Sequence, residues 1–186
     1  SSLVKTGNFN WAPKVTIAGS LSVTGDFTSG YGGTTVSGSL NVTGAFNGNL
    51  IVEPGAVVRV GSISGGSFQV KNGGLLIVEN GDCTLTAAAS IESNGRVEIH
   101  GNLNMESQIT TSNGSILIVY GNLNAISNWG MSIAGDVVVT GNFSASNGTI
   151  QNSGNVVIGG NYTHGGGGFG GTTSNNFYVV GDGSTV

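Results

Sequence analysis

The chain has 186 residues, of which 35 are glycine and 8% are charged, and its formal net charge is −4. Five Lys and Arg residues are too few for the basic patch that nucleic-acid binding requires, and no apolar run is long enough for a transmembrane helix. A hydrophobic content of 38% also excludes a disordered linker. Strong helix formers are sparse, whereas valine, isoleucine and threonine abound, so the composition predicts an all-β protein.

A short phrase recurs about every twenty residues along the chain. Apolar residues alternate up to a glycine, and a short polar residue and another apolar residue follow. The glycines that end these phrases, separated by steps of 19 to 23 residues, are Gly19, Gly38, Gly61, Gly81, Gly101, Gly121, Gly141, Gly160 and Gly181. A second column of turn residues lies six or seven positions earlier: Pro13, Gly32, Gly55, Gly74, Gly95, Gly114, Gly135, Gly154 and Asn175.

Two turn columns that keep step along the chain predict a β-solenoid, that is, a parallel β-helix. Each repeat is too short to enclose a core, but stacked coils bury one another's apolar positions. We expect one domain over residues 1–186 with about nine coils, a period of about 20 residues, and incomplete coils at 1–14 and 175–186.

The N-terminal third adds a second motif to this repeat. Residues 15–27 and 34–46 are near duplicates, and the motif Gly-x-Phe occurs at Gly7/Phe9, Gly25/Phe27, Gly44/Phe46 and Gly66/Phe68. These four phenylalanines predict an aromatic column inside the solenoid, which we favour over an external carbohydrate platform.

The repeat is interrupted in two segments. Residues 48–66 contain Pro54 and the longest step between glycines, which predicts a bulge or a protruding loop. The glycine-rich segment 165–171 stands where a strand is due, so we expect a loop. It lacks the Gly-Lys-Ser/Thr ending of a phosphate-binding loop.

In the middle of the chain, strand alternation predicts that Val97, Ile99 and Leu103 point inward and that Glu98 and His100 point outward. The residues after the glycines form a polar column that starts at Ser20, Ser39, Ser62 and Asp82. From there we predict a corner ladder with hydrogen bonds along the axis, made by Gly101, Asn102, Gly121, Asn122, Gly141, Asn142, Gly160 and Asn161.

Few residues suggest chemistry. The single cysteine, Cys83, falls in a core column and is expected to be a buried thiol. The densest polar group comprises Glu92, Arg96, Glu98, His100 and Glu106. It is compatible with a metal or acid–base site, but we favour a solvated face on which Arg96 pairs with Glu98 or Glu92. We therefore expect no catalytic residue, no metal and no cofactor, and the chain is not predicted to be an enzyme.

The two ends carry the main functional hypothesis, because solenoids need caps to remain monomeric. Neither end has a recognisable cap, so we predict head-to-tail stacking into a homopolymer. Its interface would comprise Leu3, Val4, Phe9, Trp11, Phe177, Tyr178, Val179 and Val180. If one copy followed another directly, the number of residues from Gly181 to the next Gly19 would be close to the number between Gly38 and Gly61. The alternative is a segment of a longer adhesin that binds glycans or cell surfaces through the loops at 48–66 and 164–173.

By repeat length and by its Gly-Asn corners, the chain resembles bacterial and archaeal surface β-solenoids. These include the haemagglutinin-type adhesin repeats and, more loosely, the polymerising bactofilins, from which it departs in its Asn-rich outer face and its glycine-rich segment. The resemblance implies a structural or adhesive role outside the cell or on its surface, without catalytic residues. The expected partners are copies of the chain itself and surface glycans, with no nucleic acid and no membrane insertion.

Overall fold

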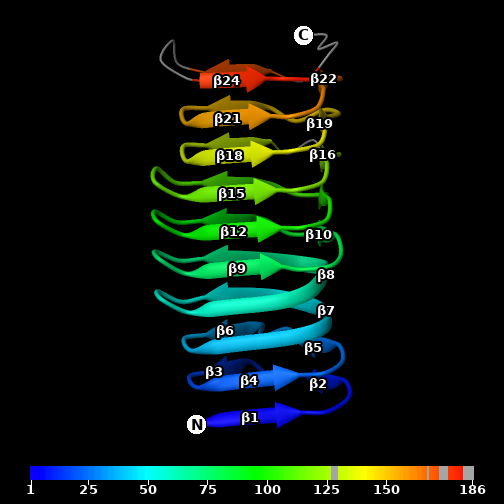
Figure 1. Cartoon of the computed structure of the whole chain (residues 1–186), viewed down its shortest axis with the longest axis vertical. Coiled ribbons are helices and arrows are strands. Elements are labelled where there is room, and N and C mark those ends of the chain that lie inside the picture. The colour runs from blue at the N-terminus through cyan, green and yellow to red at the C-terminus, as the bar shows by residue number, and fades with distance from the viewer. Residues whose placement is uncertain (127–129, 167, 172–175, 182–186) are drawn as a thin grey trace.

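The computed structural model describes residues 1–126, 130–166, 168–171 and 176–181. The chain winds into a single parallel β-solenoid of about nine coils with a period of roughly 19 residues (Figure 1). The paired strands lie one coil apart and run parallel to each other, as β12 does with β15 and β15 with β18. Over the described residues the regular elements are strands without helices, and none of these residues forms a helix that could cross a membrane. The predicted fold class is confirmed.

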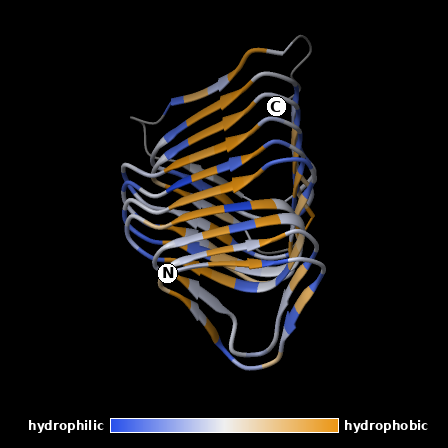
Figure 2. Cartoon of the chain, turned by 60° about the horizontal axis from the view of Figure 1, so that its bottom comes forward, coloured by the Kyte–Doolittle hydropathy of each residue, from blue (hydrophilic) through white to orange (hydrophobic). Residues whose placement is uncertain are grey.

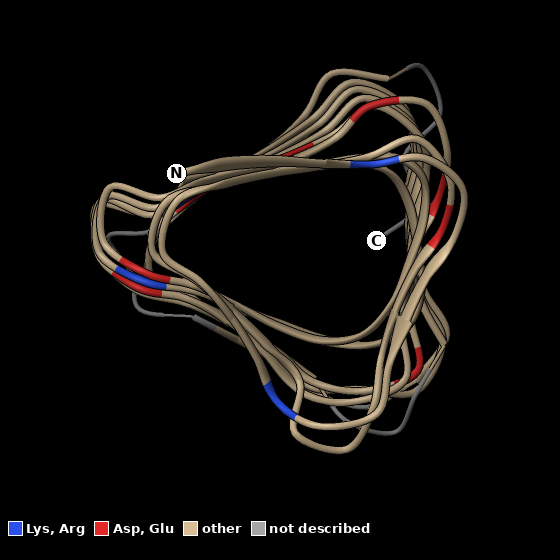
Figure 3. Ribbon diagram, turned by 90° about the horizontal axis from the view of Figure 1, so that it is seen from below, with Lys and Arg blue, Asp and Glu red and all other residues tan. Residues whose placement is uncertain are grey.

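Each coil contributes a strand to three flat faces, which enclose a triangular core (Figure 3). Face A contains β1 (Ser2–Lys5), β4 (Ser20–Val23), the first parts of β7 (Ser39–Val52) and β8 (Val57–Val70), β9 (Leu75–Val78), β12 (Arg96–Ile99), β15 (Ile116–Val119), β18 (Asp136–Val139), β21 (Asn155–Ile158) and β24 (Asn176–Val179). Face B contains β2 (Phe9–Trp11), β5 (Phe27–Ser29), the middle parts of β7 and β8, β10 (Cys83–Leu85), β13 (Leu103–Met105), β16 (Leu123–Ala125), β19 (Phe143–Ala145) and β22 (Tyr162–His164). Face C contains β3 (Val15–Ile17), β6 (Thr34–Val36), the last parts of β7 and β8, β11 (Ala89–Ile91), β14 (Ile109–Thr111), β17 (Met131–Ile133), β20 (Ile150–Asn152) and β23 (Phe169–Gly171).

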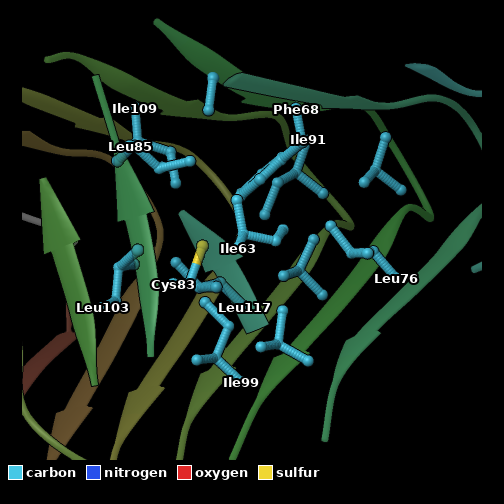
Figure 4. Packing of buried hydrophobic residues seen from close by; sticks show 14 of the residues in the cluster. Ile63, Phe68, Leu76, Cys83, Leu85, Ile91, Ile99, Leu103, Ile109 and Leu117 are labelled. Atoms are coloured by element: carbon cyan, nitrogen blue, oxygen red, sulfur yellow. The ribbon is translucent and has the colours of Figure 1, made fainter. Parts of the chain in front are cut away.

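Inward side chains from the three faces form stacked columns that fill the core. Val97 and Ile99 of β12 are 0% exposed, as is Leu103 of β13, which agrees with the predicted alternation. Cys83 lies in register between Ile63 and Leu103, among aliphatic side chains from the neighbouring coils (Figure 4). Since successive coils place similar residues on one another, the inward apolar side chains of the inner coils are covered from above and below.

The aromatic column is present but shorter than predicted. Phe9, Phe27 and Phe46 stack on face B with ring centroids 4.8 and 5.2 Å apart. Phe68 lies on face C, in register with Leu50, so its placement in this column was wrong. Its Gly-x-Phe motif resembles the other copies in sequence but lies at a different corner.

The glycine columns also differ from the predicted alignment in the first third. Gly19 and Gly38 lie at the corner where face C meets face A, together with Ala56, because Val57 N–H donates to the Gly38 carbonyl oxygen at 3.1 Å. The corner between faces A and B instead contains Gly7, Gly25, Gly44, Gly61, Gly81, Gly101, Gly121, Gly141, Gly160 and Gly181. The predicted step from Gly38 to Gly61 therefore joins two different corners. Pro13 and Gly32 lie between faces B and C, not in the predicted second column.

The segment 48–66 does not protrude. β7 and β8 continue through the corners as long strands that pair along their length, with two register shifts where the predicted bulge occurs. Pro54 lies in the tight turn between them, beside Gly55 at φ +74°. A separate loop is therefore absent here, because the two strands keep their backbone hydrogen bonds around the bends.

Two further predictions about chain segments change. The loop expected over 165–171 is wrong for Phe169–Gly171, which forms β23 and pairs with β20. A parallel ladder requires backbone groups only, and glycine supplies them. Strands β1, β2 and β3 give residues 2–17 one strand on each face, so the first coil is complete rather than cut short over 1–14. Within the expected last coil, residues 175 and 182–186 lie outside the described residues.

Candidate assembly interface

The corner between faces A and B carries hydrogen bonds along the solenoid axis. The side-chain Oδ1 of Asn102 accepts the backbone N–H of Asn122, that of Asn122 accepts from Asn142, and that of Asn142 accepts from Asn161, each at 2.8 Å. Asp82 Oδ1 accepts the N–H of Asn102 in the same way. In each bond a backbone N–H donates to the side chain of the preceding coil, and all these bonds point in one direction along the axis.

The ladder extends into the first third through residues that the sequence alignment missed. Asn8 Oδ1 accepts the N–H of Asp26 at 3.0 Å, and Asp26 Oδ1 accepts the N–H of Ala45 at 2.8 Å. Ser20 and Ser39, which were expected in the same polar column, lie at the corner between faces C and A. There the Ser39 hydroxyl donates to the Ser20 hydroxyl. Gly7-Asn8 and Gly25-Asp26 have the same pattern as Gly101-Asn102, a glycine followed by Asn or Asp. This pattern could have identified them as part of the ladder in the sequence.

Glycine is required beside the ladder because successive coils approach closely. A Cβ on Gly121 would lie 2.6 Å from the carbonyl oxygen of Gly101, and one on Gly141 would lie 2.6 Å from Asn122 Oδ1. Gly121 and Gly141 are not among the residues with positive φ. The constraint at these two glycines is therefore the space between coils rather than a backbone conformation that only glycine adopts.

The N-terminal edge exposes the inner columns of the core. Leu3 continues the column of Leu21, Phe9 that of Phe27, and Trp11 lies in register with Ser29. Leu3 is 62% exposed, and an apolar hollow opens between faces A, B and C, lined by Leu3, Phe9, Val15, Ile17 and Leu21. Val4 pairs with Ser22 and points outward, so of the four predicted interface residues at this end it alone lies off the core.

Lys5 occupies an inward column at the same edge. It is in register with Val23, which is 0% exposed, and its ammonium donates to the Thr6 carbonyl oxygen at 3.0 Å. An inward charge on an edge strand opposes the addition of a further strand. Here the charge leaves the column at the corner, in the manner of a lysine that keeps its ammonium in water.

The last described strand, β24, presents a similar edge. Phe177 and Val179 continue the inward columns of Val156 and Ile158 and are half-buried. The Phe177 ring packs edge-on against Tyr162, with centroids 5.0 Å apart. The other two predicted interface residues at this end do not continue inward columns. Tyr178 points outward, and Val180 follows the strand and is 72% exposed.

The polar group around Glu98 does not assemble into one site. Arg96 Nε lies 2.6 Å from Glu98 Oε1, and His100 Nε2 lies 3.9 Å from Glu98 Oε2. Glu92 accepts a hydrogen bond from Gln69 at a corner, and Glu106 lies beyond β13. Among the described residues no three His, Cys, Asp or Glu side chains are grouped so as to hold a metal ion.

Two buried groups titrate away from their ordinary range. Burial, assisted by the negative charge of Asp82, raises the pKa of the Cys83 thiol and keeps it protonated. Burial likewise raises the pKa of Tyr162 to about 12, and its phenol lies 2.7 Å from His164 Nδ1. Both groups belong to inward columns, so we assign them to packing.

No protein-family model matches the chain, no curated protein is significantly similar to it, and no solved structure matches its fold. The resemblance to surface β-solenoids therefore stays a likeness of pattern, and the architecture rests on the structure.

Proposed function

We propose that this chain is a structural subunit that associates head to tail by stacking its end coils. The supporting observation is that both described edges display inner core columns, with Leu3 and Phe9 at one end and Phe177 and Val179 at the other. Parallel strands in register can extend such columns, and burial of these side chains would supply the free energy. A contact between two different edges does not close on itself, so repetition gives a filament.

The number of residues from Gly181 to Gly19 of a following copy does not support this proposal. Gly181 lies at the corner between faces A and B, whereas Gly19 lies at the corner between C and A. The two residues do not mark the same point of a coil. What supports stacking is the matched direction of the strands and the apolar character of both edges.

The inward charge of Lys5 would weaken this association. A strand placed below β1 would cover the column in which Lys5 follows Val23, so its ammonium must remain at the corner near Thr6. The cost of confining this charge weakens the stacking. We place the filament outside the cell or on its surface, as the resemblance to surface β-solenoids implies.

The test uses adjacent residues of β1 that point in opposite directions. Negative-stain microscopy and light scattering of the purified chain should show fibres that lengthen with concentration. Leu3→Lys should abolish them because it adds a second charge to the core edge, whereas Lys5→Val should lengthen them. The matched control Val4→Lys, on the outer side of the same strand, should form fibres as the unaltered chain does.

Monomers at every concentration, with Lys5→Val included, would refute stacking. That result would favour the alternative in which the chain is a segment of a longer surface adhesin. Glycan-array binding of the same monomer would then be the measurement to make.

A further inference from the structure

The outer side of face A is apolar, in contrast to an ordinary solvated sheet. Its outward positions hold branched aliphatic residues on both sides of β12, in β8 and β9 and in β15, β18 and β21: Val57, Leu75, Ile77, Ile116, Ile118, Val138 and Val157. All are half-buried except Ile77, which is 7% exposed. Figure 2 shows strands that are orange along most of their length on one side of the solenoid.

The sequences of these strands also indicate that their outer side is covered. Leu75–Val78 and Ile116–Val119 are uninterrupted apolar runs, whereas a strand with one solvated side alternates. Continuous runs of this kind are typical of strands that are covered on both sides. The core covers the inner side, and within the described residues no element lies over the outer side.

We propose that face A binds face A of a second copy in an antiparallel, two-fold symmetric dimer. The two-fold axis would run along β12 and would reverse the order of the coils. It would then place β9 against β15 of the partner and β8 against β18 of the partner. Leu75 and Ile77 would pack on Ile116 and Ile118 of the second copy, as in two aligned sheets about 10 Å apart.

The charges of face A fit this arrangement. Arg59 of β8 would lie diagonally opposite Asp136 of β18 in the second copy, roughly 7 Å along the strand direction and within the reach of an arginine. Symmetry makes this pair twice, once on each side of the axis. In the single chain Arg59 pairs with Glu79 at 3.0 Å, but both side chains are exposed, so that pair does not hold Arg59 firmly.

The residues on the axis itself are already neutralised. The axis sets Arg96 and Glu98 opposite the same residues of the second copy, and their ion pair within each chain reduces the repulsion between the like charges. Outer positions toward the ends are polar, with Ser22 and Asn41 at one end and Asn176 at the other. The apolar strands on both sides of β12, with polar residues toward the ends, give an apolar area inside a polar rim, which is the usual composition of a specific interface.

The available area is sufficient for a dimer. Nine coils spaced about 4.8 Å apart, with four residues of about 3.3 Å each, offer roughly 550 Å² per copy. The total of about 1,100 Å² lies just above the lower limit for a specific interface. The branched aliphatic side chains favour a second sheet over a sugar, for which flat aromatic rings at the centre of the patch would be expected.

The experiment is carried out in the Leu3→Lys chain, so that end stacking does not contribute to the measured mass. Sedimentation equilibrium should show a monomer–dimer equilibrium, and Ile118→Lys should weaken it at least about 10-fold, since a buried ammonium replaces an aliphatic contact. The control Asn124→Lys, at an outward position of face B, should leave the dimer unchanged. Arg59→Asp should weaken the dimer, and adding Asp136→Arg should restore it.

Crosslinking tests the symmetry of the dimer. Glu98→Cys lies on the proposed axis and should give a covalent dimer with a short bismaleimide, while Asn104→Cys on face B should not. The unaltered chain is a blank because Cys83 is 0% exposed. A chain that stays monomeric in sedimentation, or that crosslinks equally through both cysteines, would overturn the proposal. Either result is independent of whether the ends stack.

Discussion

Faces A and B share one kind of interior and differ in their exteriors. Leu117 on face A and Leu123 on face B are both 0% exposed and lie in continuous aliphatic columns. Outward positions of face A hold residues such as Ile118, whereas those of face B hold Asn104 and Asn124, linked by a hydrogen bond of 2.9 Å. The solenoid therefore depends on its inner columns and corners, and the outer composition is free to differ between faces.

The largest effect should separate the two sides of one strand of face A. Leu117→Ala removes a fully buried side chain and should lower the free energy of unfolding by about 3 kcal/mol. Ile118→Ala, at the neighbouring outward position, should cost less than about 1 kcal/mol in the monomer. Urea denaturation at a concentration below that of any association would measure both. Equal costs would contradict the separation of interior from exterior.

A smaller effect should separate the corner from the exterior of face B. Asn122→Ala leaves the backbone N–H of Asn142 without its side-chain acceptor and should cost about 1–2 kcal/mol. Asn124→Ala breaks an amide–amide bond on the outer surface and should cost less than about 0.5 kcal/mol. The same denaturation experiment compares the two variants. If Asn124→Ala were the more damaging, the exterior of face B would be structurally required.

The smallest effect concerns pH and the interior of face B. Below pH 10 the Tyr162 phenol is protonated in both the folded and the unfolded chain. Because burial raises its folded pKa to about 12, the unfolded chain ionises first as the pH rises, and stability falls between pH 10 and about 12. Thermal unfolding across this window should show a shallower decline for Tyr162→Phe than for the unaltered chain. Identical declines would mean that Tyr162 does not contribute.

Much of the architecture follows from pattern alone. The repeated phrase from Val97 to Tyr162 predicts the strands, the inward columns and the ladder of Asn102, Asn122 and Asn142, because each coil repeats the same spacing. The burial of Cys83 follows from its place in such a column. A column is a local property of every repeat, so the sequence shows it many times over.

The first third was less predictable for a definite reason. Each of its near-duplicate repeats contains two glycines at strand ends, for example Gly19 and Gly25, and either could continue the column that includes Gly61. Only the hydrogen bonds between coils decide, and they join Gly61 to the column of Gly44. The same choice explains why Phe68 was assigned to the wrong column.

The apolar runs of β9 and β15 indicate a covered outer side within single strands, but the extent of the apolar surface does not follow from one coil. In β12 the outward residues are Arg96 and Glu98, which suggest a solvated sheet, but the neighbouring strands place Leu75 and Ile116 beside them. Stacking of the coils joins these outward residues into one surface.

The sequence by itself determined the all-β solenoid, its approximate period and the identity of most inward residues, since these depend on alternation and spacing within one repeat. The tertiary structure alone decided the register of the first coils, the direction of Val4 and Tyr178, the pairing of the glycine-rich β23 and the extent of the apolar surface on face A. These depend on which residues of different coils lie in contact, and such contacts are set by hydrogen bonds between backbones that all residues share.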